Sequence, residues 1–176
     1  MKNEWIFGDI AGDNYVDFIN YCVETCDYCM LVYRYYKQKG LPDPIKFVRN
    51  QLRPLCVKTK SDSAWPGTPF TFADFYRYRI CFYKLNDDVK SILYNAQHLF
   101  GFDSVRFPQD VAFFRRNKCF IYSVVHEKFA SMVDPEKKDK EMLKKFVSNY
   151  RISTNDVDDT DSAWAKVLYE TLDSQN

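Results

Sequence analysis

The 176-residue chain has few of the residues that break secondary structure and few of those that catalyse reactions at neutral pH. It contains 5 glycines, 7 prolines and 2 histidines. It has no glycine-rich loop of the kind that cradles phosphates, no nucleophile elbow and no HExxH sequence. The two histidines, His98 and His126, leave little material for general acid–base catalysis.

No charge sign dominates, and no apolar stretch is long. The 25 basic and 24 acidic residues give a net charge of +1, which indicates neither a nucleic acid nor an anionic membrane as partner. No apolar run approaches the ~20 residues of a membrane span. The charged start Met1-Lys2-Asn3-Glu4 leads into no signal-peptide core. We therefore expect a cytoplasmic protein that does not bind membranes.

Hydrophobic and aromatic residues are abundant, at 46% and 18% of the chain. A chain of this length buries roughly two-thirds of the surface that it exposes when unfolded, so one core needs neither disulfides nor a structural metal. The composition predicts a single domain spanning residues 1–176.

Apolar residues recur at helical spacing in five segments, each preceded by a residue that can cap or start a helix. Pro44 suits the first turn of the second segment, and Pro54 stops it. The predicted helices begin at Asp13, at Pro44, at Asn86 or Asp87, at Lys137 and at Thr160 or Asp161; the first ends near Glu24 and the fourth at Val147.

Five further segments are predicted strands, because they are rich in β-branched and aromatic residues or alternate between apolar and polar residues. Arg116-Asn117-Lys118 separates two of them and is typical of a hairpin turn. The chain is therefore predicted to be α+β, with a mainly antiparallel five-stranded sheet and helices packed on one face. The strands are Tyr28–Tyr36, Phe72–Tyr83, Val111–Arg115, Cys119–Val125 and Phe129–Val133.

Three of the six cysteines form the most distinct local pattern, Cys22-x3-Cys26-x2-Cys29. Three thiolates at this spacing can hold three irons of a four-iron cluster, and the pattern resembles the radical S-adenosylmethionine signature. That chemistry also needs a glycine-rich segment, which the chain lacks. A structural zinc needs a fourth ligand, and neither histidine stands at zinc-ligand spacing. We favour buried core thiols and predict no cofactor, with a metal or redox site at Cys22, Cys26 and Cys29 as the alternative.

The two histidines are the only candidates for a metal-independent ribonuclease, which uses one as base and one as acid. No serine, lysine or glycine motif accompanies His98 or His126. Glu127 points away from His126 if the strand continues through both. We predict no catalytic residues, and a small enzyme that uses these histidines or the cysteine cluster is the alternative.

Acidic residues gather near both ends of the chain, the later group being Asp156, Asp158, Asp159 and Asp161. An EF-hand loop begun at Asp156 would need glycine where Asp161 stands, so these residues are not predicted to bind calcium. If the two acidic ends converge, they form a docking face for a basic partner. Solvated helix faces are the other explanation.

The segment Tyr76-Arg77-Tyr78-Arg79 combines two residue types that are enriched at protein–protein hot spots. It is a predicted partner-binding strand, although cross-strand aromatic pairing also explains it. Interleaved basic and aromatic residues stack on single-stranded nucleic acid as well, but the near-neutral charge and the lack of an RNA-binding signature argue against that.

Four landmarks follow one another over little more than a third of the chain. Their order resembles that of small bacterial domains, some of which are encoded beside secreted or contact-delivered toxins as their immunity proteins. The cysteine-rich start and the stretch beyond Val133 depart from the resemblance. The landmarks are Ser63-Ala64-Trp65-Pro66-Gly67-Thr68, the strand Phe72–Tyr83, Phe107-Pro108-Gln109-Asp110-Val111-Ala112-Phe113, and His126-Glu127.

The resemblance implies a bacterial immunity protein that neutralises a cognate toxin by covering its active site or a surface it needs. The landmarks are expected to be fold signatures rather than contact residues. A basic nuclease is one class of toxin that an acidic face would suit. The predicted partner-binding residues are Tyr76, Arg77, Tyr78, Arg79, Asp156, Asp158, Asp159 and Asp161. The alternatives are a small enzyme and a non-catalytic interaction domain of another kind.

Overall fold

The computed structural model describes residues 3–69, 71, 76–147, 150–153 and 168–169. Eight strands and four α-helices lie in this part of the chain. The strands are β1 (Asn3–Ile6), β2 (Tyr28–Tyr36), β3 (Cys56–Ser61), β4 (Tyr76–Lys84), β5 (Gln109–Arg115), β6 (Lys118–Val124), β7 (Phe129–Val133) and β8 (Tyr150–Ser153). The helices are α1 (Asp13–Thr25), α2 (Asp43–Leu52), α3 (Asp87–Leu93) and α4 (Lys137–Phe146).

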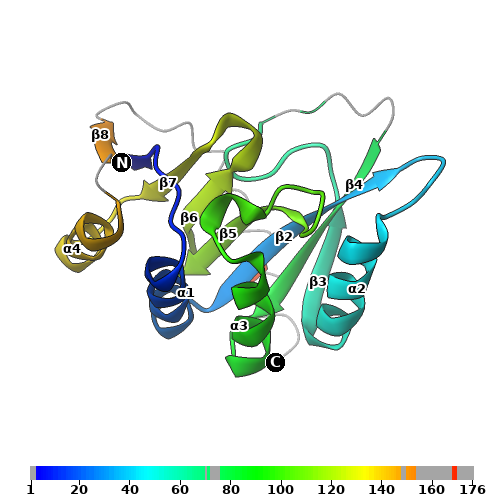
Figure 1. The fold of residues 1–176 in the computed structure, drawn as a ribbon, viewed down its shortest axis with the longest axis horizontal. Helices are drawn as coiled ribbons and strands as arrows, with labels where there is room; N and C mark the ends of the chain where they lie inside the picture. The colour runs from blue at the N-terminus through cyan, green and yellow to red at the C-terminus, as the bar shows by residue number, and fades with distance from the viewer. Residues whose placement is uncertain (1–2, 70, 72–75, 148–149, 154–167, 170–176) are drawn as a thin grey trace.

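All eight strands belong to one sheet, in the order β3-β4-β2-β5-β6-β7-β1-β8. Every neighbouring pair is antiparallel. In Figure 1, α2, α3 and α1 stand side by side along the sheet, and α4 lies beside α1 at one end. The α+β class and the antiparallel sheet predicted from the sequence are confirmed, but the prediction of five strands is wrong.

The three strands that the sequence analysis missed are β1, β3 and β8. In β3 half-buried positions alternate with exposed ones. Two of the half-buried residues are Lys58 and Lys60, so the sequence of β3 does not alternate between apolar and polar residues. β1 and β8 have four residues each, and both are held by pairing with strands distant in sequence. Such strands depend on their neighbours more than on their own composition.

One side of the sheet, which we call the helix face, is covered by all four helices. Phe18 of α1, Ile45 of α2, Leu93 of α3 and Leu143 of α4 belong to one buried cluster. Sheet residues that enter the same cluster alternate along each strand, as the pleat requires. They include Leu31, Tyr33, Cys81, Tyr83, Val111, Phe113, Ala130 and Met132.

The opposite side, which we call the loop face, carries a second buried cluster that contains no residue of these helices. Trp65, from the loop after β3, packs there, and so does Leu168. The sheet residues of this cluster are Met30, Val32, Tyr78, Ile80, Phe82, Ala112, Phe114, Cys119, Tyr122, Val124 and Val133.

A buried ion pair connects α4 to the sheet. The Arg115 guanidinium donates to both carboxylate oxygens of Asp139, at 2.9 and 2.5 Å, and Tyr21 of α1 donates to the same carboxylate. Arg115 also lies over the Phe120 ring, 3.6 Å from its centroid. Burial raises the pKa of Asp139, but hydrogen bonds from Arg115, Tyr21 and the Glu136 N–H outweigh it, so the pKa lies below its ordinary value.

The helix predicted from Thr160 or Asp161 falls outside the described residues, apart from Leu168 and Tyr169. The same holds for Asp156, Asp158, Asp159 and Asp161, and for residues 72–75 of the predicted strand Phe72–Tyr83. Among the helices that the structure describes, none has the length and apolar character needed to cross a membrane.

Candidate functional site

Three of the sequence landmarks meet at one buried carboxylate, that of Asp110. The Trp65 indole Nε1 donates to Asp110 Oδ2 at 2.8 Å, and the Val125 N–H, next to His126, donates to Oδ1 at 2.8 Å. Asp110 has a φ of 50°, a conformation that aspartate tolerates better than most residues. Burial raises its pKa, against the opposing effect of the Val125 and Trp65 hydrogen bonds. Asp110 therefore fixes the Trp65 loop and the turn that carries His126.

Gly67 is required where the Trp65 loop meets the sheet. Its φ is 77°, and a Cβ there would lie 2.4 Å from a ring carbon of Tyr122. Trp65 and Thr68 exchange two backbone hydrogen bonds of 2.9 and 2.8 Å, which close the loop. The burial of these residues fits the expectation that the landmarks stabilise the fold.

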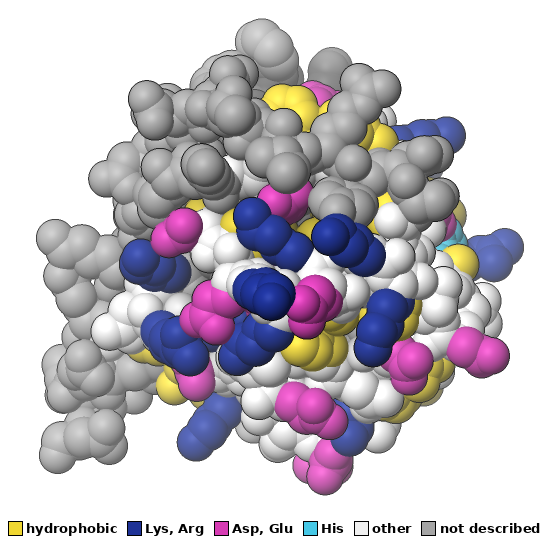
Figure 2. Space-filling model, turned by 90° about the vertical axis from the view of Figure 1, so that its left-hand side faces the viewer, with side chains coloured by type: hydrophobic (Ala, Val, Ile, Leu, Met, Phe, Trp, Pro, Cys, Tyr) yellow, Lys and Arg dark blue, Asp and Glu magenta, His cyan; other side chains and the backbone are white. Residues whose placement is uncertain are grey.

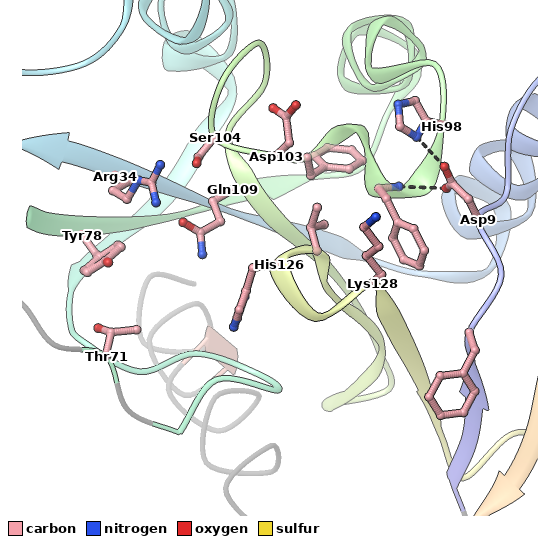
Figure 3. A pocket seen from close by; sticks show the side chains of 14 residues that line it. Asp9, Arg34, Thr71, Tyr78, His98, Asp103, Ser104, Gln109, His126 and Lys128 are labelled. Atoms are coloured by element: carbon pink, nitrogen blue, oxygen red, sulfur yellow. Dashed lines mark hydrogen bonds and ion pairs between the residues drawn. The ribbon is translucent and has the colours of Figure 1, made fainter.

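An open cavity of about 860 Å³ lies beside this junction (Figure 3). Both histidines line it, but they stand at different parts of it, with Lys128 between them in Figure 3. Arg34 of β2 and Gln109 of β5 contribute to the side nearer His126. The cavity thus joins residues from the first 10 positions, from two central strands and from the turn after β6.

His98 is held by an aspartate that is distant in sequence. Its Nδ1 lies 2.6 Å from Asp9 Oδ2, while Asp9 Oδ1 accepts a hydrogen bond from the Phe100 N–H at 3.0 Å. A carboxylate on one ring nitrogen orients an imidazole in the way that general bases are oriented. No nucleophilic side chain hydrogen-bonds to His98 among the described residues.

His126 is not on a strand. β6 ends at Val124, and His126 and Glu127 belong to a 3-10 turn, Val125–Glu127. The predicted strand to Val125 therefore stops one residue early, and Glu127 does not point away from His126: His126 Nε2 lies 3.5 Å from Glu127 Oε1. Both side chains are more than half exposed.

Two permanent cations of the cavity form no ion pair with any described residue, namely Arg34 and Lys128. The Arg34 guanidinium is held by aromatic rings, 4.9 Å from the Tyr76 centroid and 5.6 Å from that of Tyr36. The acid Asp103 accepts instead from two backbone N–H groups. The cavity therefore holds two cations with no described ion-pair partner beside two carboxylates, Asp9 and Asp103, that already accept hydrogen bonds.

Three partly exposed aromatic rings adjoin the cavity on the loop face. Trp5 and Phe129 stack with centroids 5.7 Å apart, and Phe7 lies 5.8 Å from Trp5 and 6.5 Å from Phe129. Trp5 is 37% exposed and Phe7 45%. Phe7 also lines the cavity. We call Trp5, Phe7 and Phe129 the aromatic cluster.

The predicted partner-binding strand Tyr76-Arg77-Tyr78-Arg79 is divided between the two faces. Tyr76 packs against Tyr36 at 5.1 Å and Tyr78 against Trp65 at 5.0 Å, both on the loop face. Arg77 and Arg79 point the other way and are exposed. Tyr76 therefore makes the cross-strand aromatic pair that also explains this segment, Tyr78 packs against a loop residue, and the arginines are open to solvent.

The cysteine cluster lies inside the core. Cys22, Cys26 and Cys29 are buried and free. Burial raises the pKa of each thiol, to about 12 for Cys26, which disfavours the thiolates that metals bind. Cys56 differs, because it is half-buried at the sheet edge, and a hydrogen bond with Cys81 lowers its pKa to about 7. The described residues contain no group of three His, Cys, Asp or Glu side chains placed to hold a metal ion.

The side of the molecule that carries α1 and α4 is not uniformly acidic. Figure 2 shows lysine and arginine side chains interspersed with acids over this side. The Lys140 Nζ lies 3.0 Å from Glu4 Oε1, and the Arg116 Nη1 lies 2.6 Å from Glu136 Oε1. Glu4, although buried, is thus paired with a lysine of α4, while the four aspartates of the predicted docking face lie outside the described residues.

Comparison with models of protein families, with curated proteins and with solved structures finds no match to this chain. The structure adds Asp9, Arg34 and Lys128 to the residues that the sequence singled out. The sequence could have indicated Arg34 as a functional residue, since it is the one charged residue in the otherwise apolar and aromatic strand Tyr28–Tyr36. No sequence pattern could have indicated Asp9, because its partner His98 is 89 positions away.

Proposed function

We propose that this chain works by binding another protein, as an immunity protein that neutralises a delivered toxin, and that the aromatic cluster and the adjoining cavity receive the partner. The observation that carries the proposal is the aromatic cluster itself. Three large rings remain partly exposed although the chain has a full core on both faces of its sheet.

Exposed aromatic residues that already pack against one another suit protein recognition. Their rings lose little freedom on binding, because each is held by its neighbours, and they bury a large area. Aromatic side chains surrounded by polar groups are the usual anchors of an interface. Here Lys128 and His126 supply the polar border, at the cavity that Phe7 also lines.

The immunity role rests on the order of the sequence landmarks, whose residues Trp65, Gly67 and Asp110 are packed at the loop face. Trp65, Gly67 and Asp110 support the loop face, on which the aromatic cluster lies. In such a protein, the landmarks maintain the framework and the residues around them vary with the partner. The toxin would meet a surface that is aromatic and cationic, in addition to any contact with the acidic residues 156–161.

The test is a pull-down with the C-terminal domain of the large secreted protein encoded beside this gene, combined with growth of cells that express that domain. The wild-type chain should bind the domain and restore growth. Trp5→Ala and Phe129→Ala should weaken binding at least tenfold, since each removes an anchor. Phe47→Ala is the matched control, because Phe47 is 64% exposed on α2, away from the cluster. Retained binding by both cluster variants would refute this surface, and absence of any such toxin gene or of any protection would refute the immunity role.

The second candidate is a small enzyme, and one observation favours it: His98 and His126 line the same cavity. The double variant His98→Ala, His126→Ala separates the two functions. A stoichiometric binder should keep most of its protection of growth, whereas an enzyme that depends on the pair should lose it entirely while still binding its partner.

A further inference from the structure

A second cleft, of about 480 Å³, lies at the edge of the sheet next to α2 and is lined by cations alone among its charged residues. Lys37 follows β2, Arg49 belongs to α2, and Arg77 and Arg79 come from β4. No acidic side chain of the described chain lines the cleft. None of these four side chains forms an ion pair with a described residue.

The strand register explains how the arginines come together. Arg77 and Arg79 are two residues apart, so both side chains leave the same face of β4. Arg77 pairs with Tyr35 in β2, and Arg79 pairs with Ser61 in β3. From α2, the Arg49 guanidinium lies over the Tyr35 ring, 5.8 Å from its centroid. Tyr35 thus has an arginine beside it from β4 and another from α2.

Tyr35 provides an independent sign that the cleft is incomplete. Its hydroxyl is shielded from water and has no hydrogen-bond partner among the described residues. Buried hydroxyl groups are nearly always paired, and leaving one unpaired is unfavourable. A group that enters between the arginines and draws the Tyr35 side chain toward it would satisfy the hydroxyl.

We propose that this cleft binds a ligand with two or more linked phosphates, such as inorganic pyrophosphate or the diphosphate of a nucleotide. Four cations that have no counter-charge among the described residues repel one another, and a single carboxylate supplies only one negative charge. Linked phosphates supply several within a few ångströms. Guanidinium groups bind phosphate oxygens in pairs, and three of them from different directions suit adjacent tetrahedral groups.

The cleft and the histidine cavity share one lining residue, Tyr78, but no charged residue. Arg77 and Arg79 leave β4 on the side opposite to Tyr76 and Tyr78, and neither they nor Arg49 line the histidine cavity. Phosphate binding and toxin neutralisation can therefore fail or succeed independently of each other.

The experiment titrates the purified chain with pyrophosphate, ADP or sodium sulfate at constant ionic strength. Calorimetry measures the binding of each compound, and thermal unfolding measures the stabilisation that it gives. Pyrophosphate should bind and raise the midpoint of unfolding, and sulfate should do so far less. If ADP binds more tightly than pyrophosphate, the cleft recognises a nucleotide. If ADP and pyrophosphate bind with equal affinity, the cleft recognises the linked phosphates alone.

The variants Arg77→Ala and Arg79→Ala should each weaken pyrophosphate binding at least tenfold, and Arg79→Lys should recover only part of it. Both arginines are exposed, so these variants should fold. Without ligand they should unfold at the wild-type temperature or slightly above it, since a like charge has been removed. Arg106→Ala, an exposed arginine outside the cleft, should bind as the wild type does. Equal binding by all variants, equal responses to sulfate and pyrophosphate, or no binding at millimolar pyrophosphate would each overturn the proposal.

Discussion

The two faces of the sheet are both buried, but by different means. Four helices cover the helix face, and each contributes side chains at helical spacing. On the loop face, Trp65 packs on the sheet from a loop, and the aromatic cluster stays partly exposed. Regular elements cover one face, whereas the described part of the other depends on a loop and leaves aromatic side chains partly exposed.

The same contrast appears in the buried carboxylates. On the helix face Asp139 meets the positive charge of Arg115, and its pKa is lowered. Asp110, on the other side of the molecule, receives hydrogen bonds from uncharged donors, and its pKa is raised. The surroundings of Asp139 favour its ionised form, whereas the burial of Asp110 disfavours its ionised form. Removing them should therefore have different consequences.

The largest effect is expected from Asp139→Asn. The substitution leaves the buried Arg115 charge without its counter-charge, and breaking a buried pair in this way costs about 3–5 kcal/mol. Urea unfolding should show this loss. Glu141→Gln is the control, because Glu141 is exposed and its contact with Lys137 is 3.9 Å long. A loss below about 1 kcal/mol would mean that the helix face does not depend on this pair.

Trp65→Phe tests the loop face and should cost about 1–3 kcal/mol, because it keeps an aromatic ring but leaves Asp110 without its indole donor. The measurement is again urea unfolding, with near-ultraviolet circular dichroism to follow the packing of the loop. Trp5→Phe changes the same atoms at an exposed position and should alter stability by about 0.5 kcal/mol or less. Equal losses in the two variants would remove the special role of the Trp65–Asp110 contact.

Acid should weaken the helix face through Asp139. Because the folded-state pKa of Asp139 is below its unfolded value of about 3.9, its contribution is complete above that pH and is lost as the pH falls through the folded-state pKa. Stability measured between pH 6 and pH 2 should therefore fall more steeply for the wild type than for Asp139→Asn. Parallel curves would contradict the assignment.

The last prediction concerns association rather than stability and reverses the four acidic residues Asp156, Asp158, Asp159 and Asp161 to lysine. If they form a docking face for a basic toxin, association should slow and its salt dependence should weaken or reverse. Stopped-flow association with the toxin domain is the measurement, and unchanged rates would exclude this face.

The helix face could be predicted from the sequence because its information is local. The strand Tyr28–Tyr36 has the predicted limits, and Asn86 caps α3 as expected, accepting from the Val89 N–H at 2.9 Å. The hairpin around Asn117 also forms. Apolar periodicity and capping residues act within a few positions, so one sequence is enough to read them.

The cavity and the missed strands depend on contacts between distant residues. β1 pairs with β7 and β8, and Asp9 reaches His98, yet no local pattern near residue 9 indicates either partner. The alternation of side chains along a strand predicts that the tyrosines and arginines of Tyr76-Arg77-Tyr78-Arg79 lie on opposite faces of the sheet. The tyrosines are on the buried side because Trp65 packs against Tyr78 there, and the sequence does not show where the Trp65 loop meets the sheet.

The contrast among the thiols has a practical consequence for chemical labelling. Cys22, Cys26 and Cys29 are buried and hold their protons, while Cys56 is half exposed with a pKa of about 7. An alkylating reagent at neutral pH should therefore modify Cys56 before those three, because Cys56 is more accessible and its pKa is shifted downward whereas theirs are raised. A fluorophore attached there would sit at one end of the edge strand β3, the strand whose other end, at Ser61, lines the arginine-lined cleft.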